Sequence, residues 1–144
     1  MTAPVPLALE QHLCFRLYST SLKMTQLYKP LLAPLNLTYP QYLVMVVLWE
    51  QDGIGIKDLA ARLQQDSGSI TPLVKRLEVE GYVHRGRDPN DERNRVLTLT
   101  AAGKKLRAAG AKVGQGIANA CGITHKDLDT LMSGLHTLNT HLSE

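Results

Sequence analysis

The segment of residues 56–100 constrains the fold of this chain more than any other. Its apolar spacing predicts a short amphipathic helix over residues 57–63 and a longer one over residues 67–80, joined by the polar turn Gln64-Gln65-Asp66. Helices this short cannot bury their apolar stripes alone, so the two stripes should face each other. The expected contacts join Leu59, Ala60 and Leu63 to Ile70, Val74 and Leu77. This spacing is typical of a helix-turn-helix.

The pattern after the longer helix changes from helical to strand-like. Gly81 is placed to end that helix, and residues 82–84 and 96–99 read as two β segments. The hairpin between them should have a tip, residues 87–93, that is too polar and too rich in turn residues to be strand. Ile54-Gly55-Ile56 is a candidate third strand. The hairpin predicts a wing, so residues 38–100 would form a winged helix-turn-helix region.

Double-stranded DNA is the partner that this region predicts. The outer face of the longer helix offers short hydrogen-bonding side chains followed by cations, which suits entry into a major groove. Asp91 would accept from the guanidinium of Arg93 and hold it extended toward a minor groove. Residues 75–107 contain nine basic and five acidic side chains, a net of +4, while the whole chain is +3. The candidate DNA-binding residues are Ser67, Ser69, Thr71, Lys75, Arg76, Arg87, Asp91, Arg93 and Arg95.

A long helix is predicted before this region. Apolar residues recur at helical intervals over residues 7–32, and Pro30 and Pro34 mark the expected end of the helix. Thr38 and Gln41 then form a capping box. The cap assigns the apolar run that follows it to a helix buried nearly all round, rather than to a strand.

Two more helices should follow the wing. Thr100 is placed to cap the first, although three later glycines weaken it by roughly 1 kcal/mol each relative to alanine. Those glycines are Gly110, Gly114 and Gly116. Thr124 is placed to cap the last helix, whose leucines recur at spacings of three and four. Tertiary packing must therefore hold the glycine-containing helix.

Both ends of the chain carry more apolar surface than one small domain needs. We expect residues 7–35 and 101–144 to form the interface of a homodimer jointly. Two recognition helices about one helical turn of DNA apart would then read an inverted repeat. The whole chain, residues 1–144, is predicted to be one unit that is mainly α with a small β-wing.

Composition excludes several classes of protein. The chain has 144 residues, of which 44% are hydrophobic, so it is neither disordered nor a membrane protein. Its longest apolar run, residues 42–49, is too short to span a bilayer, and no signal peptide precedes it, so we expect a cytoplasmic location. Two cysteines and five histidines show no metal-ligand or disulfide-framework spacing. We therefore expect no metal, no cofactor and no enzymatic activity.

The order of these elements, with the wing segment DPNDERNRVLTLT and the Ala-Ala-Gly that follows it, resembles the MarR family of transcriptional regulators. The N-terminal half resembles the organic hydroperoxide resistance regulators within that family. The segments that carry this second resemblance are Leu13-Cys14-Phe15, Tyr18-Ser19-Thr20, LYKPLL from Leu27 and LTYPQYL from Leu37. The resemblance implies a repressor that binds a palindromic operator as a dimer and releases it when organic hydroperoxides oxidise it.

The resemblance also assigns roles to particular residues. Cys14 alone would most simply be a small buried hydrophobe. In the family, the matching cysteine senses peroxide, and tyrosines at the positions of Tyr28 and Tyr39 reach its sulfur from the partner subunit, while Tyr18 lies one turn beyond Cys14. Phenol donors favour thiolate over thiol. The two-cysteine type of regulator further implies a disulfide from Cys14 of one subunit to Cys121 of the other.

Three alternatives stay open at this point. A MarR-type repressor could respond to a non-covalent phenolic ligand, with Cys14 as packing. A thiol peroxidase would turn over peroxide, but an enzyme needs no basic wing. An architectural DNA binder would show little preference for a palindrome over random duplex.

Overall fold

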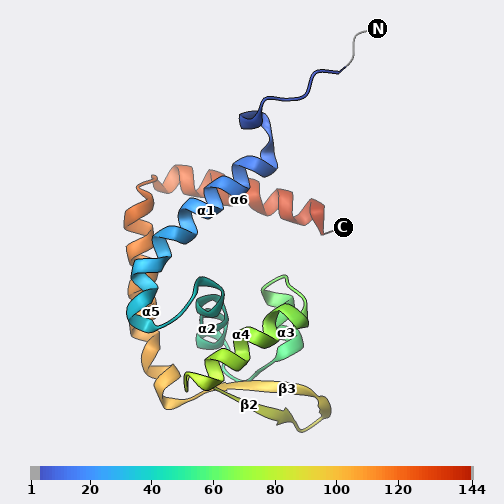
Figure 1. Ribbon diagram of the computed structural model, residues 1–144, viewed down its shortest axis with the longest axis vertical. Coiled ribbons are helices and arrows are strands. Elements are labelled where there is room, and N and C mark those ends of the chain that lie inside the picture. The colour runs from blue at the N-terminus through green and yellow to red at the C-terminus, as the bar shows by residue number, and fades with distance from the viewer. Residues whose placement is uncertain (1–3, 144) are drawn as a thin grey trace.

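The structure, a computed structural model, describes residues 4–143 of the chain. In chain order, its elements are η1 (Leu9–Gln11), α1 (Leu13–Leu32), η2 (Ala33–Leu35), α2 (Tyr39–Glu50), β1 (Ile54–Gly55), α3 (Ile56–Arg62), α4 (Ser67–Val79), β2 (Val83–Asp88), β3 (Asp91–Leu99), α5 (Ala101–Cys121) and α6 (His125–Leu142). Helices α2, α3 and α4 gather with the wing at one end of the molecule, and α6 lies across α1 at the other, with α5 running between them (Figure 1). The predicted class, mainly helical with a small antiparallel sheet, is confirmed.

Helix α2 is the centre of the apolar core. The predicted capping box is present, because the Thr38 N–H donates to Gln41 Oε1 at 2.9 Å and the Gln41 N–H donates to Thr38 Oγ1 at 3.4 Å. Most of the helix is buried, which confirms a buried helix rather than a strand. Of the six side chains predicted to meet across the helix-turn-helix, five are buried and Leu63 is half-buried. The paired stripes of α3 and α4 are therefore confirmed.

The sheet has the order β1-β3-β2, and Ile54 pairs with Leu97, so the predicted third strand is confirmed. The wing strands are longer than predicted, since β2 continues to Asp88 and β3 begins at Asp91. Only two residues remain as the turn, so the prediction of a non-strand tip over residues 87–93 was wrong. Pairing satisfies the backbone groups of both strands whatever their side chains are, and polar side chains are free to face solvent on an exposed hairpin.

Helix α1 starts later and ends less sharply than predicted. Residues 9–11 form a 3-10 turn and His12 is extended, so the α-helix begins at Leu13 instead of residue 7. Pro30 lies inside the helix, which ends at Leu32 and passes directly into η2. Among the described helices no single one is long and apolar enough to cross a bilayer, whereas Leu13–Leu35 and Tyr39–Glu50, bent by 69°, would qualify as a pair by length and composition alone.

Helix α5 is continuous, despite its glycines, up to Cys121, where Gly122 ends it at a φ of +64°. The glycines allow close packing. A Cβ at Gly110 would overlap the Trp49 ring, and one at Gly116 would lie 3.1 Å from Leu31 Cδ1. The Trp49 indole N–H also donates to the Gly103 carbonyl oxygen at 3.0 Å. These contacts fix α5 against α1 and α2, which explains why the helix persists where its own propensity is poor.

Candidate functional site

The outward face of α4 carries the predicted DNA-reading side chains. Asp66 caps the helix, because its Oδ1 accepts from the Ser69 N–H at 2.7 Å. The apolar side of α4 is buried, so Ser67, Ser69 and Lys75 point into solvent on the opposite side. The Thr71 hydroxyl donates its proton to the Ser67 carbonyl oxygen at 2.8 Å. Toward DNA, the Thr71 hydroxyl oxygen can therefore act only as a hydrogen-bond acceptor. The structure therefore gathers the predicted recognition residues on one exposed face.

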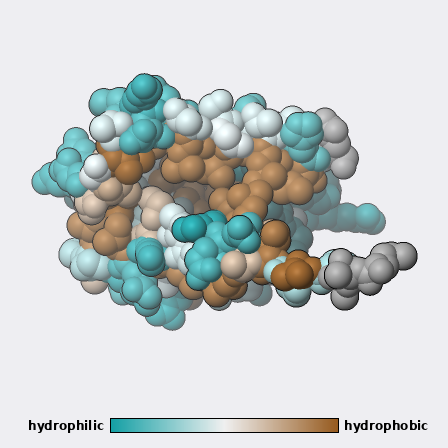
Figure 2. All heavy atoms as spheres, turned by 90° about the horizontal axis from the view of Figure 1, so that it is seen from above, coloured by the Kyte–Doolittle hydropathy of each residue, from teal (hydrophilic) through white to brown (hydrophobic). Residues whose placement is uncertain are grey.

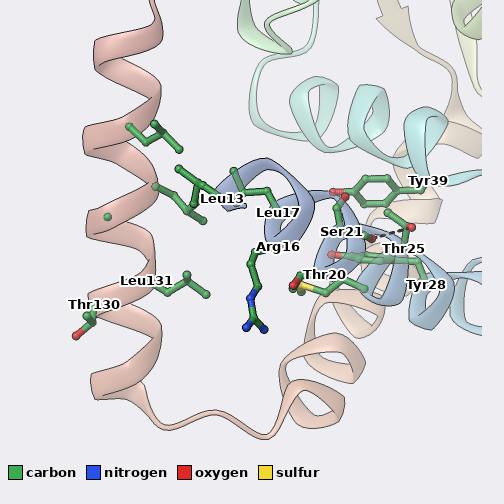
Figure 3. A pocket seen from close by; sticks show the side chains of 14 residues that line it. Leu13, Arg16, Leu17, Thr20, Ser21, Thr25, Tyr28, Tyr39, Thr130 and Leu131 are labelled. Carbon is green, nitrogen blue, oxygen red and sulfur yellow. Dashed lines mark hydrogen bonds between the residues drawn. The ribbon is translucent and has the colours of Figure 1, made fainter. Parts of the chain in front are cut away.

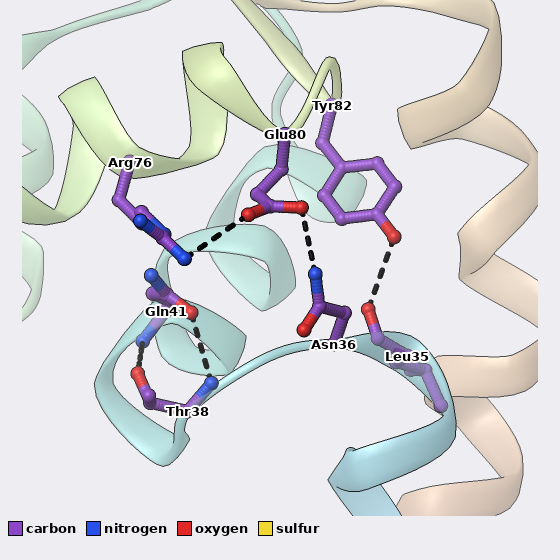
Figure 4. Close-up of polar contacts among 7 residues, drawn as sticks. All are labelled: Leu35, Asn36, Thr38, Gln41, Arg76, Glu80 and Tyr82. Atoms are coloured by element: carbon purple, nitrogen blue, oxygen red, sulfur yellow. Dashed lines mark hydrogen bonds and ion pairs between the residues drawn. The ribbon is translucent and has the colours of Figure 1, made fainter.

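Arg76, also predicted to contact DNA, already has a partner. Its guanidinium lies 3.4 Å from Glu80, whose other oxygen accepts from Asn36 Nδ2 at 2.7 Å (Figure 4). Tyr82 closes the same cluster by donating to the Leu35 carbonyl oxygen at 3.0 Å (Figure 4). The Arg76 side chain is 64% exposed, and such a surface pair is weak. A phosphate could displace it, but Lys75 is the cation of α4 that points freely outward.

The wing presents three exposed cations, Arg87, Arg93 and Arg95. Arg87 pairs with Arg95 across the hairpin, so both lie on the same stretch of the ladder. Asp91 Oδ1 accepts from the backbone N–H of Arg93 at 3.0 Å, so the predicted bond to the Arg93 guanidinium was wrong. The short Asp91 side chain can accept from the backbone N–H two residues later in the chain, and this bond does not require the long Arg93 side chain to be ordered. Among the described residues, none of the three arginines has a carboxylate within ion-pair distance.

The opposite end of the molecule has a large exposed apolar surface. A groove of about 720 Å³ separates α1 from α6 (Figure 3). Leu13, Leu17, Met24, Leu131 and Leu135 are among its lining residues. No described residue of α6 is buried, and Met132 is 59% exposed. Figure 2 shows apolar side chains gathered over this end of the molecule.

Tyr28 and Tyr39 line this groove as neighbouring rings tilted by 49° to each other. Their ring centroids are 4.6 Å apart, and Tyr42 lies behind them, 5.8 Å from Tyr28. Within residues 4–143 the hydroxyls of Tyr28 and Tyr39 (Figure 3) have no hydrogen-bond partner, whereas that of Tyr42 donates to the Gly110 carbonyl oxygen. Burial raises the pKa of Tyr28, and the charges of Tyr39, Tyr42 and Cys121 raise it further. Tyr28 is therefore a neutral donor, and Cys121 lies within electrostatic range of it.

The predicted thiol site is not complete within one chain. Cys14 lies exposed in the first turn of α1, and Tyr18, one turn on, is 65% exposed. Tyr28 lies 14 residues further along the same helix, which corresponds to about 21 Å at 1.5 Å per residue. The structure thus brings Tyr28 and Tyr39 together, with Cys121 within electrostatic range of Tyr28, and places Tyr18 one turn from Cys14. The electrostatic influence of Cys121 on Tyr28 had no signal in the sequence.

Three comparisons bear on this arrangement. Residues 37–94, which include the helix-turn-helix and most of the wing, match the MarR family. The organic hydroperoxide resistance transcriptional regulator of Bacillus subtilis is 42% identical over 130 residues, which cover 90% of this chain and 88% of that protein. The structure of reduced AbfR bound to DNA matches with a TM-score of 0.77 and 32% identity, over 92% of each chain. Disulfide-formed AbfR matches with a TM-score of 0.63 and 32% identity, over 91% of this chain and 87% of that one.

The family match covers the exposed recognition helix and the basic wing, and the relatives cover the terminal helices as well. Fold and sequence agree along nearly the whole chain. The chain therefore belongs to the MarR family of regulators.

Proposed function

We propose that this protein is a dimeric cytoplasmic repressor that binds an inverted-repeat operator and releases it when organic hydroperoxides oxidise Cys14. The observation that carries the proposal is that the hydroxyls of Tyr28 and Tyr39 have no hydrogen-bond partner among the described residues and face a groove able to receive a second subunit. A phenol that is half-buried normally finds a hydrogen-bond partner. A second subunit that fills the groove would supply such a partner.

A two-fold dimer supplies that second subunit. Soluble monomers rarely expose a continuous apolar surface as large as the one on α1 and α6. An equivalent surface from a second copy would cover it, and a two-fold axis makes each patch its own complement. The exposed side chains that support this interface are Leu13, Leu17, Leu22, Leu27, Leu128, Leu131, Met132 and Leu135.

The DNA side of the proposal depends on α4 and the wing. In the dimer, two copies of α4 enter successive major grooves, and Arg87, Arg93 and Arg95 of each wing reach the flanking minor grooves. AbfR, a relative, has been solved bound to DNA in its reduced form. The present structure is more similar to that form than to the disulfide form, which supports a DNA-competent conformation here.

The sensing step begins with the Cys14 thiolate, stabilised by hydrogen bonds from Tyr28 and Tyr39 of the other subunit and assisted by Tyr18 of its own. The sulfur attacks the distal oxygen of the hydroperoxide and the O–O bond breaks. The alkoxide takes a proton and leaves as an alcohol, so the peroxide is reduced and Cys14 is oxidised to a sulfenic acid. Apolar groove residues such as Leu17 and Met24 favour alkyl peroxides over hydrogen peroxide.

Cys121 is the proposed resolving thiol. Because Cys121 lies within electrostatic range of Tyr28 in its own chain, a Cys14 that reaches Tyr28 from the other subunit also approaches Cys121. Attack of the Cys121 sulfur on the sulfenic acid would form an intersubunit disulfide and release water. Closing that bond requires the two Cα atoms to come within about 7 Å, which moves α1 and α5 and with them the DNA-binding regions.

A gel-shift titration on an inverted-repeat duplex tests the proposal. Cumene hydroperoxide should release the wild-type protein and leave Cys14→Ser bound. Non-reducing gels of the oxidised protein should show a covalent dimer that is absent in Cys121→Ser. If Cys14→Ser releases DNA as readily as wild type, the groove instead takes a non-covalent ligand; repeated peroxide turnover without DNA binding would indicate a thiol peroxidase.

A further inference from the structure

Asn94, on the wing strand β3, bridges two elements of the DNA-binding region. Its Nδ2 donates to Asp88 Oδ2 at 3.1 Å, which joins β3 to the end of β2. The same amide lies directly against Gly55, because a Cβ at residue 55 would be 2.7 Å from Asn94 Nδ2 and 3.3 Å from its Oδ1. Gly55 is the N-cap of α3, the first helix of the helix-turn-helix.

The bridge lies where the strand pairing is irregular. Arg87 pairs with Arg95, but the next pair is Asp88 with Asp91, so residues 92–94 have no partner on β2. Asp88 anchors this irregular stretch, because its Oδ1 also accepts from the Asn90 N–H at 2.8 Å. These hydrogen bonds favour the carboxylate and lower the pKa of Asp88. A side-chain bond thus replaces the missing ladder bonds at the base of the wing tip.

The amide also decides where the neighbouring arginines point. Successive side chains of a strand alternate between its two faces. Asn94 is half-buried against β1, while Arg93 and Arg95 on either side of it are exposed. Holding Asn94 inward therefore holds both cations outward.

Stability alone does not explain an asparagine at this position. The Asn94 Oδ1 atom is buried, and among the described residues it has no hydrogen-bond partner. A buried acceptor without a donor destabilises the folded state. An apolar side chain of similar size would avoid that cost but would not bind Asp88.

We infer that Asn94 is a positioning residue that fixes the wing on the N-terminus of α3 and thereby aims Arg93 and Arg95 at DNA. The inference rests on the proposed DNA binding and goes beyond it, because Asn94 itself need not touch the duplex. Gly55 is required for this contact, since only a residue without a Cβ leaves room for the Asn94 amide.

A double-mutant cycle tests this role. The probe is a duplex selected by the wild-type protein from a random-sequence pool, and the readout is its Kd by fluorescence anisotropy. Asn94→Ala should weaken binding about tenfold, which is within the range of couplings between contacting residues. In a protein that already carries Arg93→Ala and Arg95→Ala, it should have no further effect. Asn119→Ala, an exposed asparagine of α5, is the matched control and should bind as wild type.

A second variant approaches the same contact from the other side. Gly55 has a φ of -70°, so alanine is compatible with its backbone, but the added Cβ would expel the Asn94 amide. Gly55→Ala should weaken binding as Asn94→Ala does, and the two together should be no worse than either alone. Melting temperature and dimer mass should not change by enough to explain the loss.

The outcomes separate the inference from the proposed function. An equal loss from Asn94→Ala with and without the wing arginines, or wild-type binding by Asn94→Ala, would overturn the positioning role. If the selection instead yields no preferred duplex for the wild-type protein, the proposed sequence-specific DNA binding is itself wrong.

Discussion

The Tyr42 hydroxyl donates to the Gly110 carbonyl oxygen at 3.1 Å, although the two residues are 68 positions apart. This bond ties α2, at the centre of the winged helix-turn-helix, to α5, which ends at Cys121. The Trp49 ring fills the space beside Gly110 that any side chain would need. A displacement of the Cys121 end of α5 would therefore be transmitted to the DNA-binding region through this contact.

Gly110→Ala should destabilise the fold by roughly 1–3 kcal/mol, because the new methyl group would overlap the Trp49 ring. Urea unfolding followed by tryptophan fluorescence measures the change. Gly114→Ala is the matched control in the same helix, since its Cβ would meet only the Tyr42 hydroxyl, at 4.0 Å. That variant should be neutral or more stable by up to about 1 kcal/mol, because alanine favours helix. Equal destabilisation of both variants would contradict the packing argument.

Tyr28→Phe and Tyr39→Phe should each slow the oxidation of Cys14 by about tenfold or more at pH 7. Each change keeps the ring and removes one proposed donor to the thiolate, and a hydrogen bond to a charged group contributes roughly 1.5–3 kcal/mol. The loss of titratable thiol after mixing with cumene hydroperoxide gives the rate. Tyr82→Phe removes a hydroxyl that bonds the Leu35 carbonyl oxygen, so it should leave the rate unchanged. Wild-type rates in both groove variants would remove the tyrosines from the mechanism.

The phenols of Tyr28 and Tyr42 should ionise above their ordinary pKa of 10.0, mainly because Tyr42 is buried and Tyr28 is half-buried. A raised pKa means that the folded state holds the proton more tightly than the unfolded state. The stability that follows is complete below pH 10 and is lost as the pH rises through the folded pKa. Absorbance at 295 nm follows the titration. Tyr42→Phe should remove part of the absorbance change that occurs above pH 10. If the part that disappears lies at or below pH 10 instead, the pKa of Tyr42 is not raised.

Arg95→Ala should reduce the salt dependence of operator binding. Each phosphate contact contributes about 0.9 to the slope of log Kd against log salt concentration, and a dimer would lose two contacts. The slope should therefore fall by about 1.8, measured by anisotropy over several salt concentrations. Lys126→Ala, an exposed cation at the start of α6, should leave the slope unaltered. A weaker affinity with an unchanged slope would mean that Arg95 does not contact a phosphate.

Many local features were predictable from the sequence. The capping box of Thr38 and Gln41, the caps at Thr100 and Thr124, and the end of α4 at Gly81 follow from rules that involve only a few neighbouring residues. The apolar periodicity of α3 and α4 also identified the residues that pack between them. Such signals depend on backbone geometry that a short segment adopts by itself.

Other features depend on contacts between distant segments. The sequence determined the helices and the winged helix-turn-helix, because caps, turn residues and periodicity are encoded locally, whereas the candidate sensor residues came from the resemblance to the organic hydroperoxide resistance regulators. Only the tertiary structure decided that the wing tip is strand, that Gly110 makes room for Trp49 and that Gly55 makes room for Asn94. The physical reason is that each of these depends on space left or filled by a residue far away in the chain, and no local propensity records that space.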